Sequence, residues 1–120
     1  MSMPEKENVA DYPRPPLIEL INGPISVSIG NEIIAQDTQY IRICETYHPP
    51  TIYIDQNAFV IGTLQKTSGR VSYCEWKGIA EYWTLSKADG SDSRHRAAWS
   101  YPSPTKHFEK LAGWIALYPR

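Results

Sequence analysis

The chain has 120 residues, the size of one domain, and its 42% hydrophobic content can supply a core without disulfide bonds. A formal net charge of −1 argues against a strongly basic nucleic-acid-binding protein, and no apolar run approaches the length of a membrane span. Cys44 and Cys74 are too few for a disulfide framework. These features predict a reduced, cytoplasmic protein without a signal peptide and with neither a nucleic-acid nor a membrane partner.

Charged and aromatic residues are unevenly represented. Residues 1–60 carry a net charge of −5, and residues 61–120 carry a net charge of +4. A solvated surface produces such an asymmetry, and a pocket for an anionic small molecule would produce it too. Four Trp and eight Tyr stand against two Phe, which favours aromatic side chains with a polar tip. Such side chains suit a core that borders a pocket or an interface.

The first half of the chain predicts an arm followed by short strands. Residues 1–16 end in prolines and are expected to form a flexible arm before a single β domain over residues 17–120. Asn22-Gly23-Pro24 predicts a turn, and Ile25–Ile29 alternates apolar with polar residues as a half-buried strand does. Gly30-Asn31 then predicts a hairpin. Further strands are expected at residues 32–36, 40–45 and 51–55.

The second half is centred on the stretch Tyr73–Trp83, which predicts a strand, a kink at Gly78 and a second strand. A polar loop at residues 66–70 precedes this stretch. Asp89-Gly90 is the strongest hairpin dipeptide in the chain. The partner strand of this hairpin is therefore expected at about Arg94–Tyr101.

A short helix and a last strand complete the predicted domain. Ser103-Pro104 is typical of a helix start, with a hydroxyl at the N-cap and proline at the first helical position. Gly113 ends the helix as a C-cap glycine does, and Trp114–Tyr118 predicts a final strand. With about seven short strands and one short helix near the C-terminus, the chain is predicted to be a mainly β single domain.

Three side chains of the central stretch, Cys74, Glu75 and Lys77, are candidates for catalysis. Cys74 could be a nucleophile activated by Lys77, or a buried free thiol. Glu75 and Lys77 are two residues apart, so on an unbroken strand they share one face. There they would form an exposed ion pair, or present an acid and a base to a ligand.

Other kinds of site find little support in the sequence. No ligand pair of the C-x-x-C type occurs and the three histidines lie in separate segments, so no metal site is expected. No Walker loop, G-x-G-x-x-G or G-x-S-x-G motif occurs, and no cofactor is expected. Arg94-His95-Arg96 is interpreted as a solvated rim of the sheet rather than a nucleic-acid patch.

Two aromatic motifs stand out in the second half of the chain. They are Cys74-Glu75-Trp76-Lys77-Gly78 with Ala80 and Tyr82-Trp83, and Ala98-Trp99-Ser100-Tyr101-Pro102 with Pro104. Together they resemble the signature of a bacterial family known as domain of unknown function 427 (DUF427). Further segments fit the same pattern, at residues 35–38, 45–46, 48–50, 53, 112–113 and 118–119. The resemblance covers about residues 14–119 and implies a strongly bent antiparallel sheet, a β-tent or partly open barrel, with no established activity.

We expect a small-molecule-binding β domain whose aromatic-lined pocket carries Glu75 and Lys77 as polar anchors. The residues expected to bind the unidentified small molecule are Tyr53, Trp76, Lys77, Tyr82, Trp99 and Tyr101. An enzyme that uses Lys77 or Cys74 on a small anionic or polar substrate is one alternative. A non-catalytic protein-interaction module with an exposed aromatic face or a free sheet edge is the other.

The chain departs from the family pattern in two places. In the family, a proline and then an acid three positions on tend to follow the position of Tyr53, whereas this chain has Asp55 and Ala58. The role of that acid is therefore not carried over. Relatives also continue past the position of Pro119 with another β segment. The resemblance thus implies that an edge strand is missing or comes from a partner chain, which would favour a homodimer through a free sheet edge.

Overall fold

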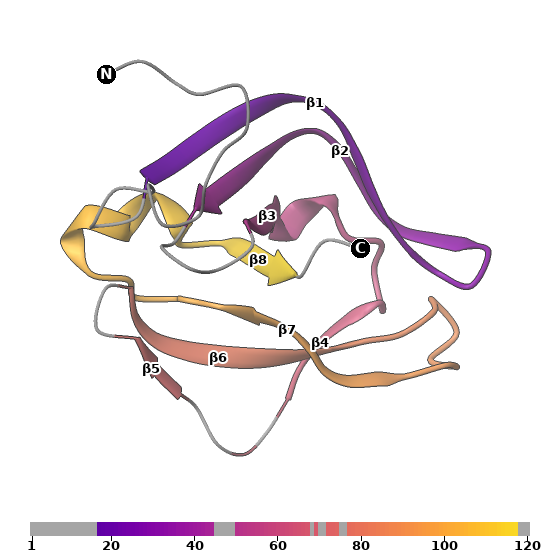
Figure 1. Ribbon diagram of the computed structural model, residues 1–120. Coiled ribbons are helices and arrows are strands. Elements are labelled where there is room, and N and C mark those ends of the chain that lie inside the picture. The colour runs from indigo at the N-terminus through magenta and orange to yellow at the C-terminus, as the bar shows by residue number, and fades with distance from the viewer. Residues whose placement is uncertain (1–16, 45–49, 68, 70–71, 75–76, 118–120) are drawn as a thin grey trace.

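The computed structural model describes residues 17–44, 50–67, 69, 72–74 and 77–117, which form one mainly β domain (Figure 1). Eight strands build an antiparallel sheet. Seven of them lie in the order β1-β2-β3-β8-β7-β6-β4, and the eighth, β5, pairs with the start of β6, whereas β4 pairs with its end. The sheet is strongly bent and does not close into a barrel, as expected for a β-tent or partly open barrel. The strands are β1 (Leu17–Ile29), β2 (Glu32–Cys44), β3 (Thr51–Asp55), β4 (Leu64–Lys66), β5 (Ser72–Cys74), β6 (Gly78–Leu85), β7 (Arg94–Ser100) and β8 (Trp114–Leu117).

The first two strands are longer than predicted. The turn expected at Asn22-Gly23-Pro24 is wrong, because β1 runs through this tripeptide with only a register shift between Asn22 and Ile25. β1 lies at the edge of the sheet, where a proline that lacks an N–H removes no ladder hydrogen bond. The two strands expected at residues 32–36 and 40–45 are likewise one strand, β2, which pairs with β1 throughout. The result is one long bent ribbon (Figure 1).

The predicted pairing of the central stretch with the Trp-Ser-Tyr-Pro segment is confirmed. β6 and β7 form an antiparallel hairpin in which Tyr82 lies opposite Trp99. The expected turn at Asp89-Gly90 closes this hairpin, with Gly90 at a φ of 86° and its N–H donating to the carbonyl of Lys87. Lys66, expected in a polar loop, instead ends the short strand β4, which pairs with β6.

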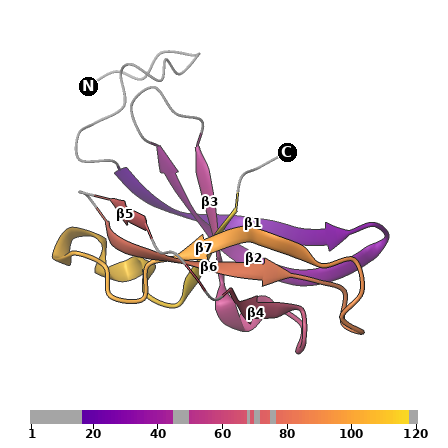
Figure 2. The same ribbon diagram turned by 90° about the horizontal axis from the view of Figure 1, so that it is seen from below.

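The two long hairpins reach the same end of the molecule (Figure 2). There the backbone N–H of Ala88, in the β6–β7 connection, donates to a carboxylate oxygen of Glu32 at 2.7 Å. This contact joins the tip of the β1–β2 ribbon to the opposite side of the fold. It therefore holds the β1–β2 ribbon and the β6–β7 hairpin together.

The helical segments among the described residues are short 3₁₀ turns, η2 (Gln56–Ala58) and η3 (Lys106–Leu111). The helix expected from Ser103-Pro104 starts later, at Thr105, whose side chain makes no capping hydrogen bond. Instead the backbone N–H of Thr105 donates to the carbonyl of Lys77 at 3.0 Å, so this segment is fixed to the start of β6. Gly113 follows the helix at a φ of 83°, as predicted. In the described part of the chain, no helix is long and apolar enough to cross a membrane.

Two hydrophobic clusters lie on opposite sides of the central β3–β8 pair. Successive residues of a strand point to opposite faces, so Tyr53 and Ala116 belong to one cluster and their neighbours Ile54 and Ile115 to the other. The first cluster is Ile41, Ile43, Tyr53, Ala80, Tyr101, Phe108, Leu111 and Ala116. The second is Ile29, Ile34, Ala35, Ile54, Phe59, Leu85, Ala98 and Ile115.

Replacement of Gly78 by alanine is expected to destabilise the fold by about 1–3 kcal/mol. Gly78 has a φ of 107°, which L-residues rarely adopt, and an added Cβ would lie 3.4 Å from the carbonyl oxygen of Ser103. Urea unfolding measures the change. Gly23→Ala is the matched control, because its Cβ would meet nothing within 4 Å and its φ lies outside the left-handed region. Equal stabilities of the two variants would contradict the conformation described for Gly78.

Candidate functional site

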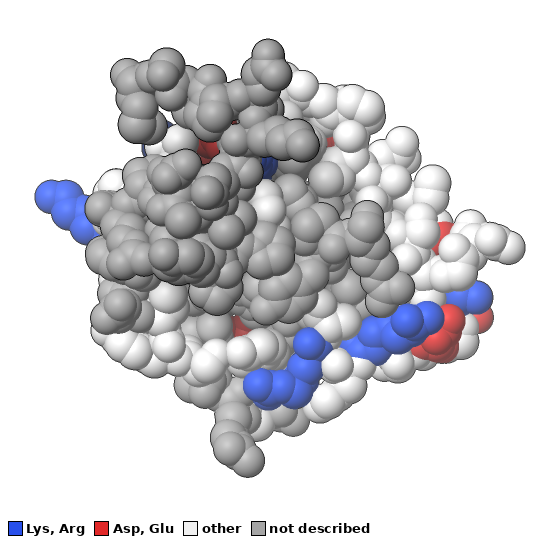
Figure 3. All heavy atoms as spheres, viewed as in Figure 1, with Lys and Arg blue, Asp and Glu red and all other residues white. Residues whose placement is uncertain are grey.

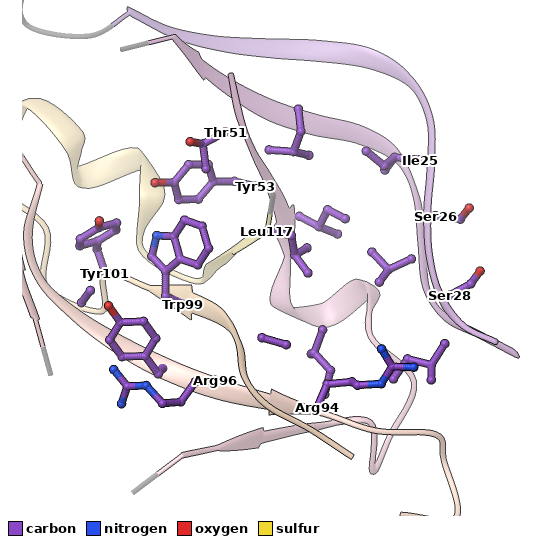
Figure 4. A pocket seen from close by; sticks show the side chains of 18 of the residues that line it. Ile25, Ser26, Ser28, Thr51, Tyr53, Arg94, Arg96, Trp99, Tyr101 and Leu117 are labelled. Atoms are coloured by element: carbon purple, nitrogen blue, oxygen red, sulfur yellow. The ribbon is translucent and has the colours of Figure 1, made fainter. Parts of the chain in front are cut away.

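A cleft with a volume of about 1120 Å³ lies between the β1–β2 ribbon and the β6–β7 hairpin, across β3 and β8. Side chains from six strands, β1, β3, β5, β6, β7 and β8, contribute to its lining. Figure 4 shows Tyr53, Trp99 and Tyr101 on one side of this cleft and Ile25 on the other, with Leu117 between them. The hollow therefore has an aromatic end and an aliphatic end.

Most of the residues predicted to bind a ligand line this cleft. Those in its lining are Tyr53, Lys77, Tyr82, Trp99 and Tyr101. Cys74, one of the predicted catalytic candidates, also lines the cleft and is half-buried. Trp76 and Glu75 lie outside the described residues, so their part in a site stays a prediction. Catalysis by Lys77 or Cys74 also stays a prediction.

Lys77 is the most unusual residue of the cleft, because it is only 4% exposed. Lysine is almost never buried to this degree without compensating contacts. The Lys77 Nζ lies 5.5 Å from the centre of the Tyr101 ring, in range for a cation–π interaction. Lys77 directly precedes Gly78, the first residue of β6, which pairs with Cys74 of β5. The Lys77 Nζ is thus shielded from open water, beside the Tyr101 ring.

Arg96 and Tyr82 form a second cationic and aromatic pair. The guanidinium carbon of Arg96 lies 3.8 Å from the centre of the Tyr82 ring, which is a stacked arrangement. The Tyr82 hydroxyl is in turn hydrogen-bonded to the Ser72 hydroxyl at 2.5 Å. The ring is therefore fixed at both its face and its tip, and the arginine that rests on it has a defined position.

A bulge in β7 brings Arg96 to the cleft. Between two successive residue pairs of the hairpin, β6 has one residue and β7 has three, residues 95–97. Arg96 adopts a φ of 54°, in the left-handed region. As a result, Arg96 and its neighbour Ala97 both line the cleft. Plain strand alternation would place Arg96 on the face opposite Ala97 and Trp99.

The arginines are the functional candidates that the sequence did not reveal. Arg94 and Arg96 are exposed, as a solvated rim requires, and both also line the cleft. Nothing in the local sequence indicates the bulge. The aliphatic side chains of β1 were also missed, because they lie more than 60 positions from Trp99 in the chain.

The described part of the cleft lining is cationic. It contains Lys77, Arg94 and Arg96 and, among the residues described, no Asp or Glu. Basic side chains also gather along the lower right of the face in Figure 3, in the region of β6 and β7. Arg94 is ion-paired with Asp92 outside the cleft at 3.0 Å. The hydrogen bond from Arg94 lowers the pKa of the Asp92 carboxyl, and the charge of the arginine adds to this effect.

Among the described residues, no group of three or more His, Cys, Asp or Glu side chains is arranged so that it could hold a metal ion. An aromatic and cationic lining suits organic anions instead.

These features define a small, mainly β domain with a bent open sheet and a cationic, aromatic cleft. The chain belongs to the family described as domain of unknown function DUF427, whose model matches residues 17–120. A search of curated proteins found no match to the chain.

Proposed function

We propose that this protein binds a small organic anion in the cleft between the β1–β2 ribbon and the β6–β7 hairpin. The observation that carries the proposal is the buried amine of Lys77 at the aromatic end of the cleft, beside Tyr101. An anionic group would complement this amine where few water molecules compete for it.

The aromatic side chains supply the second half of the interaction. Tyr53 comes from β3, and Trp99 and Tyr101 come from the end of β7 and the residue after it; all three lie at the same end of the cleft (Figure 4). Flat apolar groups bind to such rings by stacking and by burial of apolar surface. A cleft with a mostly apolar wall and a few converging polar groups is the usual form of a ligand site. The proposed ligand therefore combines an anionic group with an apolar body.

Lys77→Met tests the proposal with 2-naphthoate, an aromatic carboxylate, as the probe. Loss of a charge-assisted hydrogen bond worth about 1.5–3 kcal/mol should weaken binding roughly tenfold or more in isothermal calorimetry. Methionine keeps the length and the apolar stem of the side chain. The free energy of unfolding should therefore change by less than about 1 kcal/mol.

Lys106→Met serves as the control, because Lys106 is an exposed lysine outside the cleft lining. It should leave 2-naphthoate binding unchanged. Two results would contradict the proposal. The first is equal affinity of both variants and the parent protein. The second is a loss of about 3–5 kcal/mol of stability in Lys77→Met, which would indicate a structural ion pair.

A further inference from the structure

We infer that residues 101–105, called here the positioning segment, hold Lys77 in its binding geometry, so that anion binding in the cleft and docking of this segment are coupled. The inference rests on the proposed function and adds how that site is controlled. A displacement of the positioning segment would release the amine, and a ligand bound at the amine would in turn hold the segment in place.

The positioning segment contacts Lys77 at both ends of the residue. At the tip of the side chain, the centre of the Tyr101 ring lies 5.5 Å from the Lys77 Nζ. At the backbone, the N–H of Thr105 donates to the carbonyl of Lys77 at 3.0 Å. Lysine loses more rotamer freedom on ordering than most residues, so an amine that is already restrained binds its ligand at a smaller entropic cost.

The backbones of the two segments also touch directly after Lys77. A Cβ added at Gly78 would lie 3.4 Å from the carbonyl oxygen of Ser103, 3.7 Å from the Cα of Pro104 and 3.7 Å from the N of Thr105. No side chain separates the start of β6 from the positioning segment at this point. A shift of the segment therefore moves the backbone that carries the lysine.

The positioning segment is itself stiff and well anchored. Pro102 and Pro104 fix φ at two of its positions. Tyr101 at its start is 6% exposed and packs in one hydrophobic cluster with Phe108 and Leu111 of η3, which follows the segment. The segment is thus held by the core on both sides, and it transmits this restraint to Lys77.

Thr105→Pro tests the inference on the full chain. Thr105 has a φ of −61°, which proline adopts, so the substitution removes the N–H donor with little change of the backbone. Affinity for 2-naphthoate in isothermal calorimetry should fall about three- to tenfold, the effect of one lost hydrogen bond that orders the amine. In a Lys77→Met background the same substitution should cost no further affinity, because the amine that it displaces is then absent.

Thr105→Ala is the conservative variant, because it keeps the N–H and removes only side-chain atoms. It should bind 2-naphthoate within about twofold of the parent protein. Equal losses in Thr105→Ala and Thr105→Pro would assign the effect to the side chain and overturn the inference. A loss in Thr105→Pro that persists in the Lys77→Met background would also overturn it, since the cleft would then be disturbed as a whole.

Hydrogen exchange of the parent protein decides the inference even if Thr105→Pro does not fold. At about ten times its Kd, 2-naphthoate should slow exchange of the Thr105 N–H about tenfold, because the opening that frees this amide also releases the ligand. The control amide is Gly90, whose N–H donates to the carbonyl of Lys87 in the β6–β7 turn. Its exchange should change less than about twofold. Equal protection of both amides would contradict a local coupling.

The two proposals fail in different ways. If Lys77→Met weakens 2-naphthoate binding but Thr105→Pro binds as the parent protein does, the cleft binds the anion and only the coupling is wrong. If Lys77→Met leaves 2-naphthoate binding unchanged, the proposed function itself is wrong.

Discussion

Replacement of Phe108 by alanine is expected to lower the free energy of unfolding by about 3–5 kcal/mol. Phe108 is 1% exposed and packs in the cluster that contains Tyr53, Tyr101 and Leu111. Removal of its ring would leave a cavity under the β3–β8 pair, where the surrounding strands can relax little. A loss of this size is a large part of the ~5–15 kcal/mol that stabilises a typical domain. Urea unfolding followed by tryptophan fluorescence measures the change.

The matched control for Phe108→Ala is Lys110→Ala, in the same η3 segment with an exposed side chain. It should change stability by no more than about 0.5 kcal/mol. A loss below 1 kcal/mol in Phe108→Ala would mean that η3 does not pack as described. Because the Thr105 N–H next to η3 donates to the carbonyl of Lys77, such a result would also question the position of the candidate amine.

Elements determined by local pattern were predicted well from the sequence. Thr51–Asp55 alternates apolar side chains and is a strand with the predicted bounds. Asp89-Gly90 closes a hairpin because glycine there adopts a positive φ that other residues avoid. Gly113 ends η3 for the same reason. In each case the signal and the structure involve the same few residues.

The errors arose where the outcome depends on distant strands. Asn22-Gly23-Pro24 has the composition of a turn, yet it continues β1 because that strand is at the sheet edge and has a partner in β2. β4 is only three residues long and is a strand because β6 pairs with it. Neither edge position nor pairing is encoded within such short segments.

The candidate site was predicted only in part, because the position of some of its residues also depends on distant strands. The crowding of aromatic and charged residues around Lys77, together with the family motifs, pointed to side chains that do line the cleft. Arg96 was assigned to a solvated rim because cationic residues at a strand edge are most often solvated, and no local signal indicates the bulge that also brings Arg96 to the cleft. Ile25 and Val27 were assigned to a strand but not to the cleft, since their approach to Trp99 depends on the bend of the whole ribbon.

Two adjacent isoleucines on β2 provide a sharp test of the strand register in the β1–β2 ribbon. Ile34 is 0% exposed, in the cluster with Phe59 and Leu85, whereas Ile33 is 49% exposed. Ile34→Ala should destabilise the protein by about 2–5 kcal/mol. Ile33→Ala removes the same atoms from a half-exposed face and should cost at most about 1 kcal/mol. Urea unfolding of both variants under one set of conditions gives the difference directly.

The comparison of the two isoleucines tests the register of the ribbon, because a slip of one residue moves every side chain of a strand to the other face. The carbonyl of Ile34 accepts the N–H of Val60 at 2.8 Å, which fixes β2 against the segment after η2. β2 also pairs with β1, in which Val27 lies opposite Ala35 and faces the cleft. If the two substitutions cost the same, or Ile33→Ala costs more, β2 is shifted. The cleft would then lose the wall that β1 provides.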